Sequence, residues 1–182
     1  MKATGIVRRI DDLGRVVVPK EIRKTLRIRE GDPLEIFTDR EGEIILKKYS
    51  PLGEMSFFAK QYAEALAQSS GYMVSITDKD NHVAVAGNGK KDLVGKPVSK
   101  RLEEIMEKRR SVLATSEEKA YVPLVEGEME PYANEVICPI LAEGDVIGAV
   151  IIANRDARAV MGDVEKKLAS AAAGFLGRQI EH

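Results

Sequence analysis

Strand-like alternation of apolar and polar residues dominates the first 48 residues of the chain. β-Branched residues alternate with polar ones in four segments, and turn sequences rich in Asp and Gly separate the segments of each pair. The strands are expected at residues 4–10, 15–18, 33–38 and 43–48. Between the two pairs, residues 20–27 have helical spacing, and Pro19 suits the first turn of a helix. The pattern therefore predicts the order β-β-α-β-β.

Longer helical stripes and longer strands follow in the rest of the chain. Phe58, Tyr62 and Leu66 recur every four residues, and Gly71 stands where a glycine commonly ends a helix. Helices are expected at residues 55–70, 99–110 and from 163 onward. Strands are expected at residues 72–77, 82–86, 135–142 and 146–153, in two hairpins. This order predicts an antiparallel sheet with helices on one face, and an α+β fold class overall.

A domain boundary is expected at Tyr49-Ser-Pro-Leu-Gly-Glu54, because Pro and Gly together follow a strand-like run. We therefore predict a first domain at residues 1–50, a linker at 51–55 and a second domain at 56–182. About 50 residues bury little apolar surface alone, so domains of that size usually need a metal, disulfides or a partner chain. The first domain contains no Cys and no His, which leaves self-association.

The composition is that of a globular protein, with 44% hydrophobic and 31% charged residues among 182. One Cys cannot form an internal disulfide, and the longest apolar run, residues 146–153, is far shorter than the about 20 residues of a spanning helix. The N-terminal residues lack the apolar stretch of a signal peptide. We therefore expect no membrane partner and a cytoplasmic location.

Charge is distributed unevenly although the net formal charge is only −1. Residues 1–29 contain nine Lys or Arg and three Asp or Glu, a net of +6, whereas the remainder contains 19 basic and 26 acidic residues, a net of −7. At about 100° per residue, four cations of the helix at 20–27 share an arc of about 100°, opposite Ile22 and Leu26. Charges on any surface helix point outward, so this arc alone leaves nucleic-acid binding and a solvated face open. With the hairpin arginines, seven cations could contact phosphates. They are Arg8, Arg9, Arg15, Lys20, Arg23, Lys24 and Arg27.

The sequence from Gly5-Ile-Val-Arg-Arg-Ile to Lys24-Thr-Leu, followed by Gly31-Asp-Pro-Leu-Glu-Ile, resembles the AbrB-type swapped-hairpin DNA-binding domain of bacterial transition-state regulators. The resemblance covers about residues 3–50. It implies an intertwined dimer in which two chains form one small β-barrel and bind double-stranded promoter DNA. It also implies DNA contacts at Arg8, Arg15, Arg23 and position 24, where this chain has Lys. A Lys there favours a phosphate contact, because Lys lacks the bidentate fork with which Arg reads guanine.

Two motifs of the second domain, Val136-Ile-Cys-Pro-Ile and Gly144-Asp-Val-Ile-Gly-Ala-Val, resemble the central hairpin of GAF domains. An AbrB-type domain ahead of a GAF-like domain is similar to sporulation regulators of endospore-forming bacteria, which act in the forespore. That resemblance implies a transcription factor that activates and represses, and a tetramer assembled through helices of the GAF-like domains. The expected oligomerisation residues are Phe58, Tyr62, Leu66, Leu168, Phe175 and Leu176. Packing within one chain would explain the same apolar stripes.

Catalytic and metal-binding patterns are absent from the sequence. Neither Gly87-Asn-Gly-Lys90 nor Gly95-Lys-Pro97 has the spacing of a phosphate-binding loop. His82 and His182 are expected at the surface, and Cys138 is expected to be a buried, inert thiol. Only Asn154 remains of the signature with which some GAF domains bind cyclic nucleotides. We therefore predict no enzyme activity and no cofactor. An unidentified small effector, held between the Ser75 and Val136 regions, and a domain that only assembles oligomers both stay open.

Two other functions fit parts of the pattern. The swapped-hairpin fold also occurs in antitoxins, but those proteins usually end in a short toxin-wrapping tail, whereas this chain continues into a folded domain. A ligand-sensing adaptor, whose basic domain docks an acidic protein partner, would share the charge asymmetry. Binding to DNA as opposed to a protein partner distinguishes these hypotheses.

Overall fold

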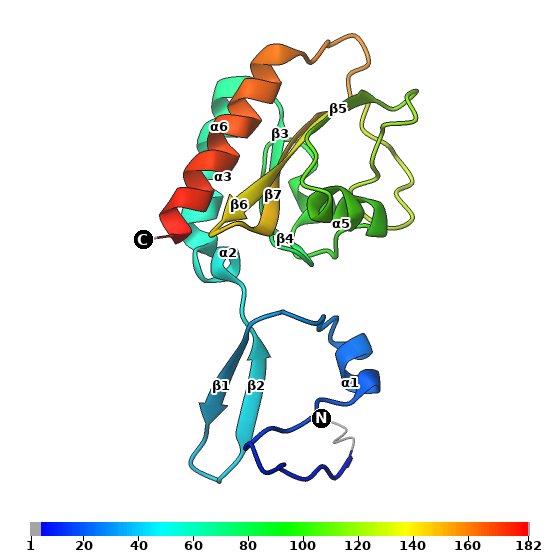
Figure 1. Ribbon diagram of the computed structural model, residues 1–182. Helices are drawn as coiled ribbons and strands as arrows, with labels where there is room; N and C mark the ends of the chain where they lie inside the picture. The colour runs from blue at the N-terminus through cyan, green and yellow to red at the C-terminus, as the bar shows by residue number, and fades with distance from the viewer. Residues whose placement is uncertain (1–4, 182) are drawn as a thin grey trace. The chain divides into compact units, whose positions relative to one another are not determined.

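The computed structural model describes residues 5–181, which divide into two compact units. Unit 1 ends at Tyr49 and unit 2 begins at Ser50. Figure 1 shows both units, and each is considered by itself below.

Unit 1 contains a short helix and a two-stranded antiparallel hairpin. The elements are α1 (Lys20–Thr25), β1 (Leu34–Thr38) and β2 (Ile44–Lys48). Ile36 pairs with Leu46 in the register. The turn is stabilised by Asp39, whose Oδ1 accepts hydrogen bonds from the backbone N–H groups of Glu41 and Glu43, both at 2.9 Å. Gly42 completes the turn with a φ of 87°, which a residue with a Cβ rarely adopts. The predictions for this helix and hairpin are confirmed.

The two strands expected at residues 4–10 and 15–18 do not form within one chain. Thr4 lies outside the described residues, and residues 5–10 and 14–18 have no strand assignment. The turn between them does form, because Asp11 Oδ1 accepts hydrogen bonds from the N–H groups of Leu13 at 3.0 Å and Arg15 at 2.8 Å. A strand requires a neighbour that supplies ladder hydrogen bonds. Alternation in the sequence indicates an extended segment but does not show which chain provides that neighbour.

Unit 2 is built around a five-stranded antiparallel sheet with the order β4-β3-β7-β6-β5. Its strands are β3 (Met73–Thr77), β4 (His82–Ala86), β5 (Val112–Thr115), β6 (Asn134–Ala142) and β7 (Asp145–Asn154). Its helices are α2 (Pro51–Glu54), α3 (Ser56–Ser70), α4 (Lys90–Leu93), α5 (Lys100–Glu107) and α6 (Asp163–Ile180). The predicted helices and hairpins of this part are confirmed, including Gly71 as the left-handed C-cap of α3 with a φ of 75°.

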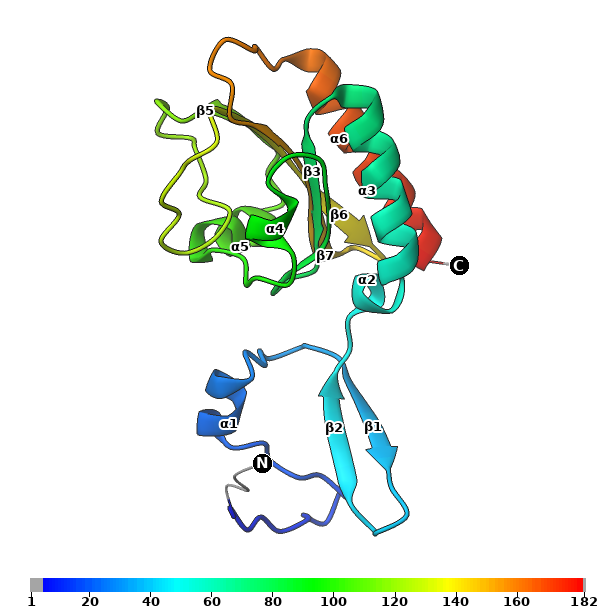
Figure 2. The same ribbon diagram turned by 180° about the vertical axis from the view of Figure 1, so that it is seen from behind.

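Helices cover both faces of this sheet, so the expectation of helices on one face was wrong. Figures 1 and 2 show α3 and α6 side by side on one face and α5 on the other. Two cores result, since Val136, Cys138 and Ile140 of β6 pack with α3 and α6, whereas Ile137 packs with Leu102 and other residues on the α5 side. Strands buried on both faces lose the clean alternation that marks a solvated side. The pattern of apolar and polar residues therefore did not predict a helix on the second face of the sheet.

The backbone of α6 packs closely against the backbone of β6. A Cβ added at Gly177 of α6 would overlap the carbonyl oxygen of Leu141 on β6. Glycine at this position allows the helix axis to approach the strand more closely than any other residue would. The tight contact buries Leu176, Ala172 and Ala173 beside it.

His82 is fully buried in unit 2, so its expected surface position was wrong. The Leu124 carbonyl oxygen lies 3.0 Å from Nε2, which requires that Nε2 carry the proton, and the Ser75 hydroxyl then donates to Nδ1 at 2.7 Å. Burial lowers the pKa of His82 below its usual value. Cys138 is buried as expected, and burial raises the pKa of its thiol. His182 lies outside the described residues.

Candidate nucleic-acid interface

Three of the expected interface cations, Lys20, Arg23 and Lys24, lie on α1. The helix begins after Pro19, the only buried residue among residues 5–49, and contains no buried residue itself. Ile22 is half-buried as an anchor should be, but Leu26 is 55% exposed. The apolar side of α1 is therefore only partly covered within one chain.

The four remaining cations flank this helix in sequence. Arg27 follows α1 with a φ of 52°, and it is exposed, like Arg8, Arg9 and Arg15. Arg23 differs, because it is half-buried and its Nε is buried without a hydrogen-bond partner. A buried N–H without an acceptor is energetically unfavourable, so Arg23 is the cation of this set whose hydrogen bonding is incomplete within one chain.

Arg15 is held in place by its own turn. Its Nε lies 2.8 Å from Asp11 Oδ2, and hydrogen bonds from the Arg15 backbone and side chain lower the pKa of Asp11. The Arg15 side chain is still 68% exposed. The ion pair therefore orients the guanidinium at the turn of residues 11–15 and leaves much of the side chain accessible.

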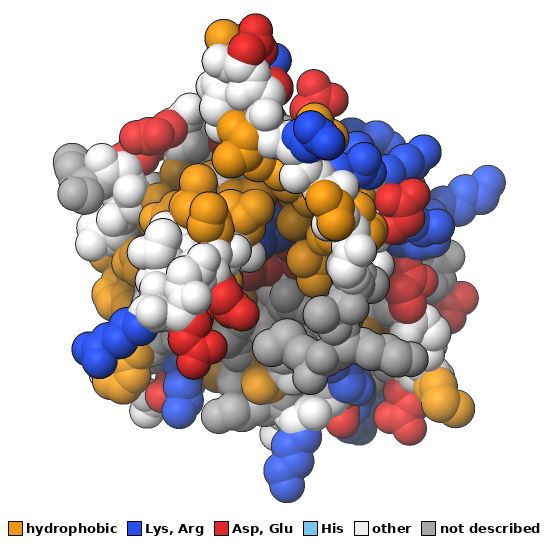
Figure 3. Space-filling view, turned by 90° about the horizontal axis from the view of Figure 1, so that it is seen from below, with side chains coloured by type: hydrophobic (Ala, Val, Ile, Leu, Met, Phe, Trp, Pro, Cys, Tyr) orange, Lys and Arg blue, Asp and Glu red, His pale blue; other side chains and the backbone are white. Residues whose placement is uncertain are grey.

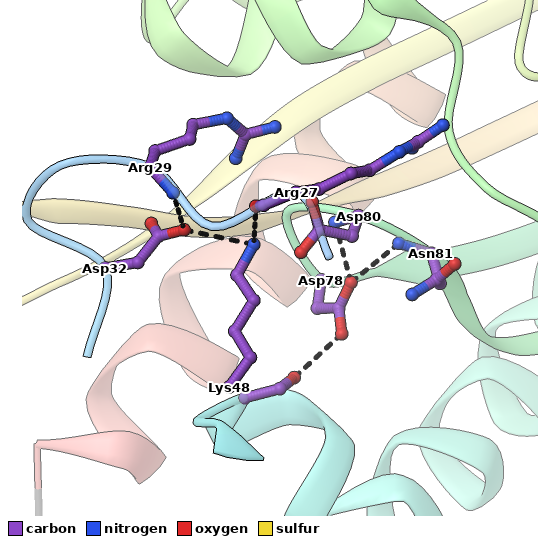
Figure 4. A network of polar contacts seen from close by, with 8 residues as sticks. Arg27, Arg29, Asp32, Lys48, Asp78, Asp80 and Asn81 are labelled. Carbon is purple, nitrogen blue, oxygen red and sulfur yellow. Dashed lines mark hydrogen bonds and ion pairs between the residues drawn. The ribbon is translucent and has the colours of Figure 1, made fainter. Parts of the chain in front are cut away.

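An ion pair that the sequence did not reveal fixes the loop after α1. Lys48 Nζ on β2 lies 3.1 Å from Asp32 Oδ2 and donates to the Arg27 carbonyl oxygen at 2.7 Å. The same Asp32 oxygen accepts the Arg29 backbone N–H at 2.9 Å (Figure 4). These contacts tie the backbone of Arg27 and Arg29 to the hairpin. Their only sequence signal is an acidic residue after Gly31 and a basic pair in β2, and this signal does not identify the pairing.

A further polar network in Figure 4 belongs to unit 2, where it anchors the start of that unit. Ser50 caps α2 by accepting the Gly53 N–H at 3.0 Å, and its hydroxyl donates to Asp78 Oδ2 at 2.8 Å. Asp78 Oδ1 accepts the N–H groups of Asp80 and Asn81. The Pro51-containing segment is therefore fixed to the turn between β3 and β4.

Unit 1 exposes many large apolar side chains beside its cations. The view in Figure 3 shows hydrophobic side chains gathered around a hollow, with Lys and Arg side chains along one side. Twelve such residues of unit 1 are 42% or more exposed, which leaves almost no core within one chain. They are Ile6, Val7, Ile10, Leu13, Val16, Val17, Leu26, Ile36, Phe37, Ile44, Ile45 and Leu46. Exposed apolar surface of this extent in a small unit marks a protein interface.

The six expected oligomerisation residues lie on α3 and α6 of unit 2. Five of them, Phe58, Tyr62, Leu66, Leu168 and Phe175, are half-buried, and three aromatic rings form a cluster in which Tyr62 and Phe175 stack with centroids 5.4 Å apart. Leu176 is fully buried in the core of its own unit, so it does not lie on an exposed face that could form the expected interface. Phe57 and Val164 on the same helices are instead well exposed.

The two residues that were expected to flank an effector have no exposed surface within one chain. Ser75 and Val136 are both fully buried. One cavity of about 560 Å³ lies instead between the N-terminus of α5 and the loop at residues 121–131, which the sequence did not single out. A smaller cavity of about 220 Å³ is lined in part by Asn154 and Arg155. Among residues 5–181, no group of His, Cys, Asp and Glu is suited to a metal ion, and no helix of that part could span a membrane.

The structure thus defines a class of protein with a small basic β-rich unit and a GAF-like unit. The second unit resembles the GAF domain of PixJ from Thermosynechococcus elongatus with a TM-score of 0.59, 14% identity, and coverage of 74% of this chain and 89% of that one, a likeness of fold alone. The transition state regulatory protein AbrB of Bacillus subtilis is 65% identical to this chain over 51 residues, which cover 28% of this chain and 52% of the relative.

Family models match both parts of the chain. Residues 54–181 match the stage V sporulation protein T C-terminal, transcription factor family, and residues 7–53 match the antidote-toxin recognition MazE family of bacterial antitoxins. Stage V sporulation protein T of Bacillus subtilis is 58% identical over 181 residues, which cover 100% of this chain and 99% of the relative. The chain therefore belongs to the stage V sporulation protein T family, as the combined resemblance predicted.

Proposed function

We propose that this protein regulates transcription of sporulation genes by binding double-stranded promoter DNA through unit 1. The observation that carries the proposal is the gathering of seven cations on a unit of 49 residues whose sequence matches AbrB. Six of these side chains are exposed, and the seventh, Arg23, is half-buried with a buried Nε that has no partner. Such a surface neutralises phosphates and releases counterions.

The arginines and lysines of this surface have different roles in the proposal. Arg8, Arg15 and Arg23 read bases or clamp phosphates, because a guanidinium offers two parallel donors. Lys24 contacts a phosphate as a point charge. Arg9, Lys20 and Arg27 add further phosphate contacts and set the register on the duplex.

Two chains of unit 1 form the DNA-binding body. Unit 1 leaves apolar residues exposed and the extended segments at 5–10 and 14–18 without strand partners. Pairing with the same segments of a second chain would cover the apolar residues and complete the strands. A swapped-hairpin dimer buries both. It also doubles the number of cations that face DNA.

Unit 2 assembles dimers into a tetramer and senses a small molecule. The half-buried stripe on α3 and α6, with exposed Phe57 and Val164, provides the apolar surface for assembly. The protein acts in the forespore, as activator at some promoters and repressor at others, without catalysing a reaction.

Titration of the full chain with a labelled duplex tests the DNA assignment, and the duplex is taken from sites recovered by a genome-wide footprint. We expect tight binding that weakens linearly on a log–log plot against salt, and a loss of about 1–3 kcal/mol per chain for Arg23→Ala. Arg178→Ala, an exposed cation on α6, is the control. Unchanged affinity in Arg23→Ala would contradict the proposal.

A basic unit that docks an acidic protein partner, either as an adaptor or as an antitoxin does, is the competing function. The MazE match over residues 7–53 reflects a fold that both functions use. Immobilised promoter DNA and immobilised cell protein, offered to the same full chain, separate the two. Retention on protein but not on DNA would favour the adaptor.

A further inference from the structure

A small cavity opens at one end of the sheet of unit 2, where β3 begins and β7 ends. Its volume is about 220 Å³, and residues from four separate segments line it. The lining includes Met73, Gly89, Tyr132, Ala153, Arg155 and Asp156. At about 30 Å³ per water molecule, the volume corresponds to about seven waters. Pockets for drug-sized ligands run from about 300 Å³ upward, so this one suits a smaller molecule.

Tyr132 lines this cavity, and its hydroxyl group is buried without a hydrogen-bond partner. Tyr132 is 2% exposed, and its hydroxyl oxygen lies 3.0 Å from the position that a Cβ of Gly89 would occupy. Gly89 has a φ of +94°, a conformation that residues with a Cβ rarely adopt, and a side chain there would also crowd the Tyr132 hydroxyl. A buried hydroxyl without a partner is unfavourable. Burial raises the pKa of Tyr132, so the group is protonated and can donate at neutral pH.

A guanidinium stands beside this hydroxyl. Arg155 Cζ lies 4.8 Å from the centroid of the Tyr132 ring, so the cation stacks on the ring. Arg155 pairs only loosely with acidic groups, at 3.4 Å from Asp92 Oδ2 and 3.8 Å from Glu130 Oε2, and these partners are more than half exposed. Long, exposed ion pairs contribute little, so a better acceptor can replace them.

A carboxylate on α4 faces the same point. Asp92 Oδ2 lies 3.9 Å from the Cβ position of Gly89, so the hydroxyl, the guanidinium and this carboxylate meet around one residue. Asp156 also lines the cavity, but it is already paired with Arg158. Two lining residues therefore carry hydrogen-bond donors, and the Asp92 carboxylate lies next to the lining as the partner of Arg155.

We propose that this cavity binds a small zwitterion of the α-amino acid class. The ligand carboxylate accepts hydrogen bonds from Tyr132 and Arg155, and its ammonium group pairs with Asp92. A free phosphate fits this arrangement poorly, because Asp92 and Glu130 would repel a dianion. Two of the other lining residues, Met73 and Ala153, are apolar and fully or nearly buried, which favours a small aliphatic side chain beside them.

The proposal deepens the sensing role proposed above for unit 2, and its test contains no DNA. Calorimetric titration and thermal unfolding of the full chain would use glycine, L-alanine, L-valine, acetate, methylammonium and inorganic phosphate. We expect at least one amino acid to bind at least tenfold more tightly than acetate, methylammonium or phosphate. Equal binding of acetate would overturn the zwitterion assignment, and the absence of heat and of any unfolding shift for all six probes would overturn the site.

Three variants test the geometry. Tyr132→Phe removes only the unpartnered hydroxyl, so without ligand the variant should unfold at or above the temperature of the original chain, while its amino-acid affinity falls about tenfold. Arg155→Gln and Asp92→Asn should each weaken binding at least tenfold. Tyr62→Phe on α3 and Arg178→Gln on α6 are the matched controls and should bind normally. Normal binding by all three pocket variants would overturn the proposal, whereas failure of DNA binding with intact amino-acid binding would affect only the DNA assignment.

Discussion

Lys48 Nζ lies 3.1 Å from Asp32 Oδ2, and this pair connects β2 to the loop that carries Arg27 and Arg29. Asp32 is almost fully buried and the Lys48 side chain is about four-fifths buried. Loss of one partner therefore leaves a charge in a poorly solvated position, which destabilises a protein more than loss of an exposed pair.

We expect Lys48→Met to lower the free energy of unfolding by about 1–3 kcal/mol, which is below the range for a fully buried pair because Lys48 keeps some solvent contact. The same variant should bind DNA more weakly, since the Arg27 backbone is no longer tied to the hairpin. Urea unfolding and DNA titration of the full chain measure both effects. Arg40→Met in the exposed β1–β2 turn is the control. A stability equal to that of Arg40→Met would show that the pair has no structural role.

The salt dependence of DNA binding gives a separate prediction for the hairpin arginine Arg15. Replacing one phosphate-binding cation by a neutral residue should reduce the slope of log affinity against log salt by about 1 for each phosphate that the cation neutralised. Arg15→Gln removes the charge and leaves the Asp11 turn, because Asp11 Oδ1 accepts a backbone N–H at this position. A slope identical to that of the original chain would mean that Arg15 does not face phosphate.

Contiguous patterns predicted unit 2 well, because its elements bury their own apolar stripes. The helix expected at 55–70 is Ser56–Ser70, and the strand expected at 146–153 lies within Asp145–Asn154. The burial of residues whose contacts are distant in the sequence could not be predicted. His82 is buried only because Ser75 and Leu124 satisfy both ring nitrogens, and Leu124 belongs to a loop without periodicity.

Charge and spacing suffice to propose the interface cations, which stay a prediction, but they do not indicate the contacts that hold these residues in place. Lys48 and Asp32 meet through the pairing of strands and loops in three dimensions, which no local pattern encodes. The prediction of the first two strands of unit 1 failed for a related reason. Their alternation is correct for strands, yet the expected ladder partner is not found within residues 5–49.

Assembly through unit 2 and stability of unit 2 should respond to different residues. Leu176 is fully buried, so Leu176→Ala should lower the free energy of unfolding by about 2–5 kcal/mol. Phe57 is well exposed on α3, so Phe57→Ser should leave stability within about 0.5 kcal/mol and shift the mass toward the dimer. Light scattering and urea unfolding of both variants check this division. An unchanged mass for Phe57→Ser, and for the companion Val164→Ser, would remove this face from the tetramer contact.

A buried carboxylate makes the stability of unit 2 depend on pH. Glu135 on β6 is fully buried, and burial raises its pKa to about 8, while one oxygen accepts the Val122 N–H at 2.6 Å and the other has no hydrogen-bond partner. Because the folded pKa is above the unfolded value near 4.5, the folded protein holds an extra proton between these pH values. This group therefore favours folding fully below about pH 4.5, and the contribution is lost as the pH rises to about 8.

Glu135→Gln keeps the acceptor for Val122 and removes the ionisation. The variant should be more stable than the original chain at pH 8.5 by a few kcal/mol, and the difference should shrink progressively as the pH falls to 5. Urea unfolding at half-unit pH intervals measures the two curves. Glu104→Gln, an exposed glutamate on α5, is the control and should track the original chain. A constant difference between Glu135→Gln and the original chain from pH 5 to 8.5 would show that Glu135 ionises at its ordinary pKa, because only a carboxylate whose pKa is shifted by burial makes the gap widen with pH.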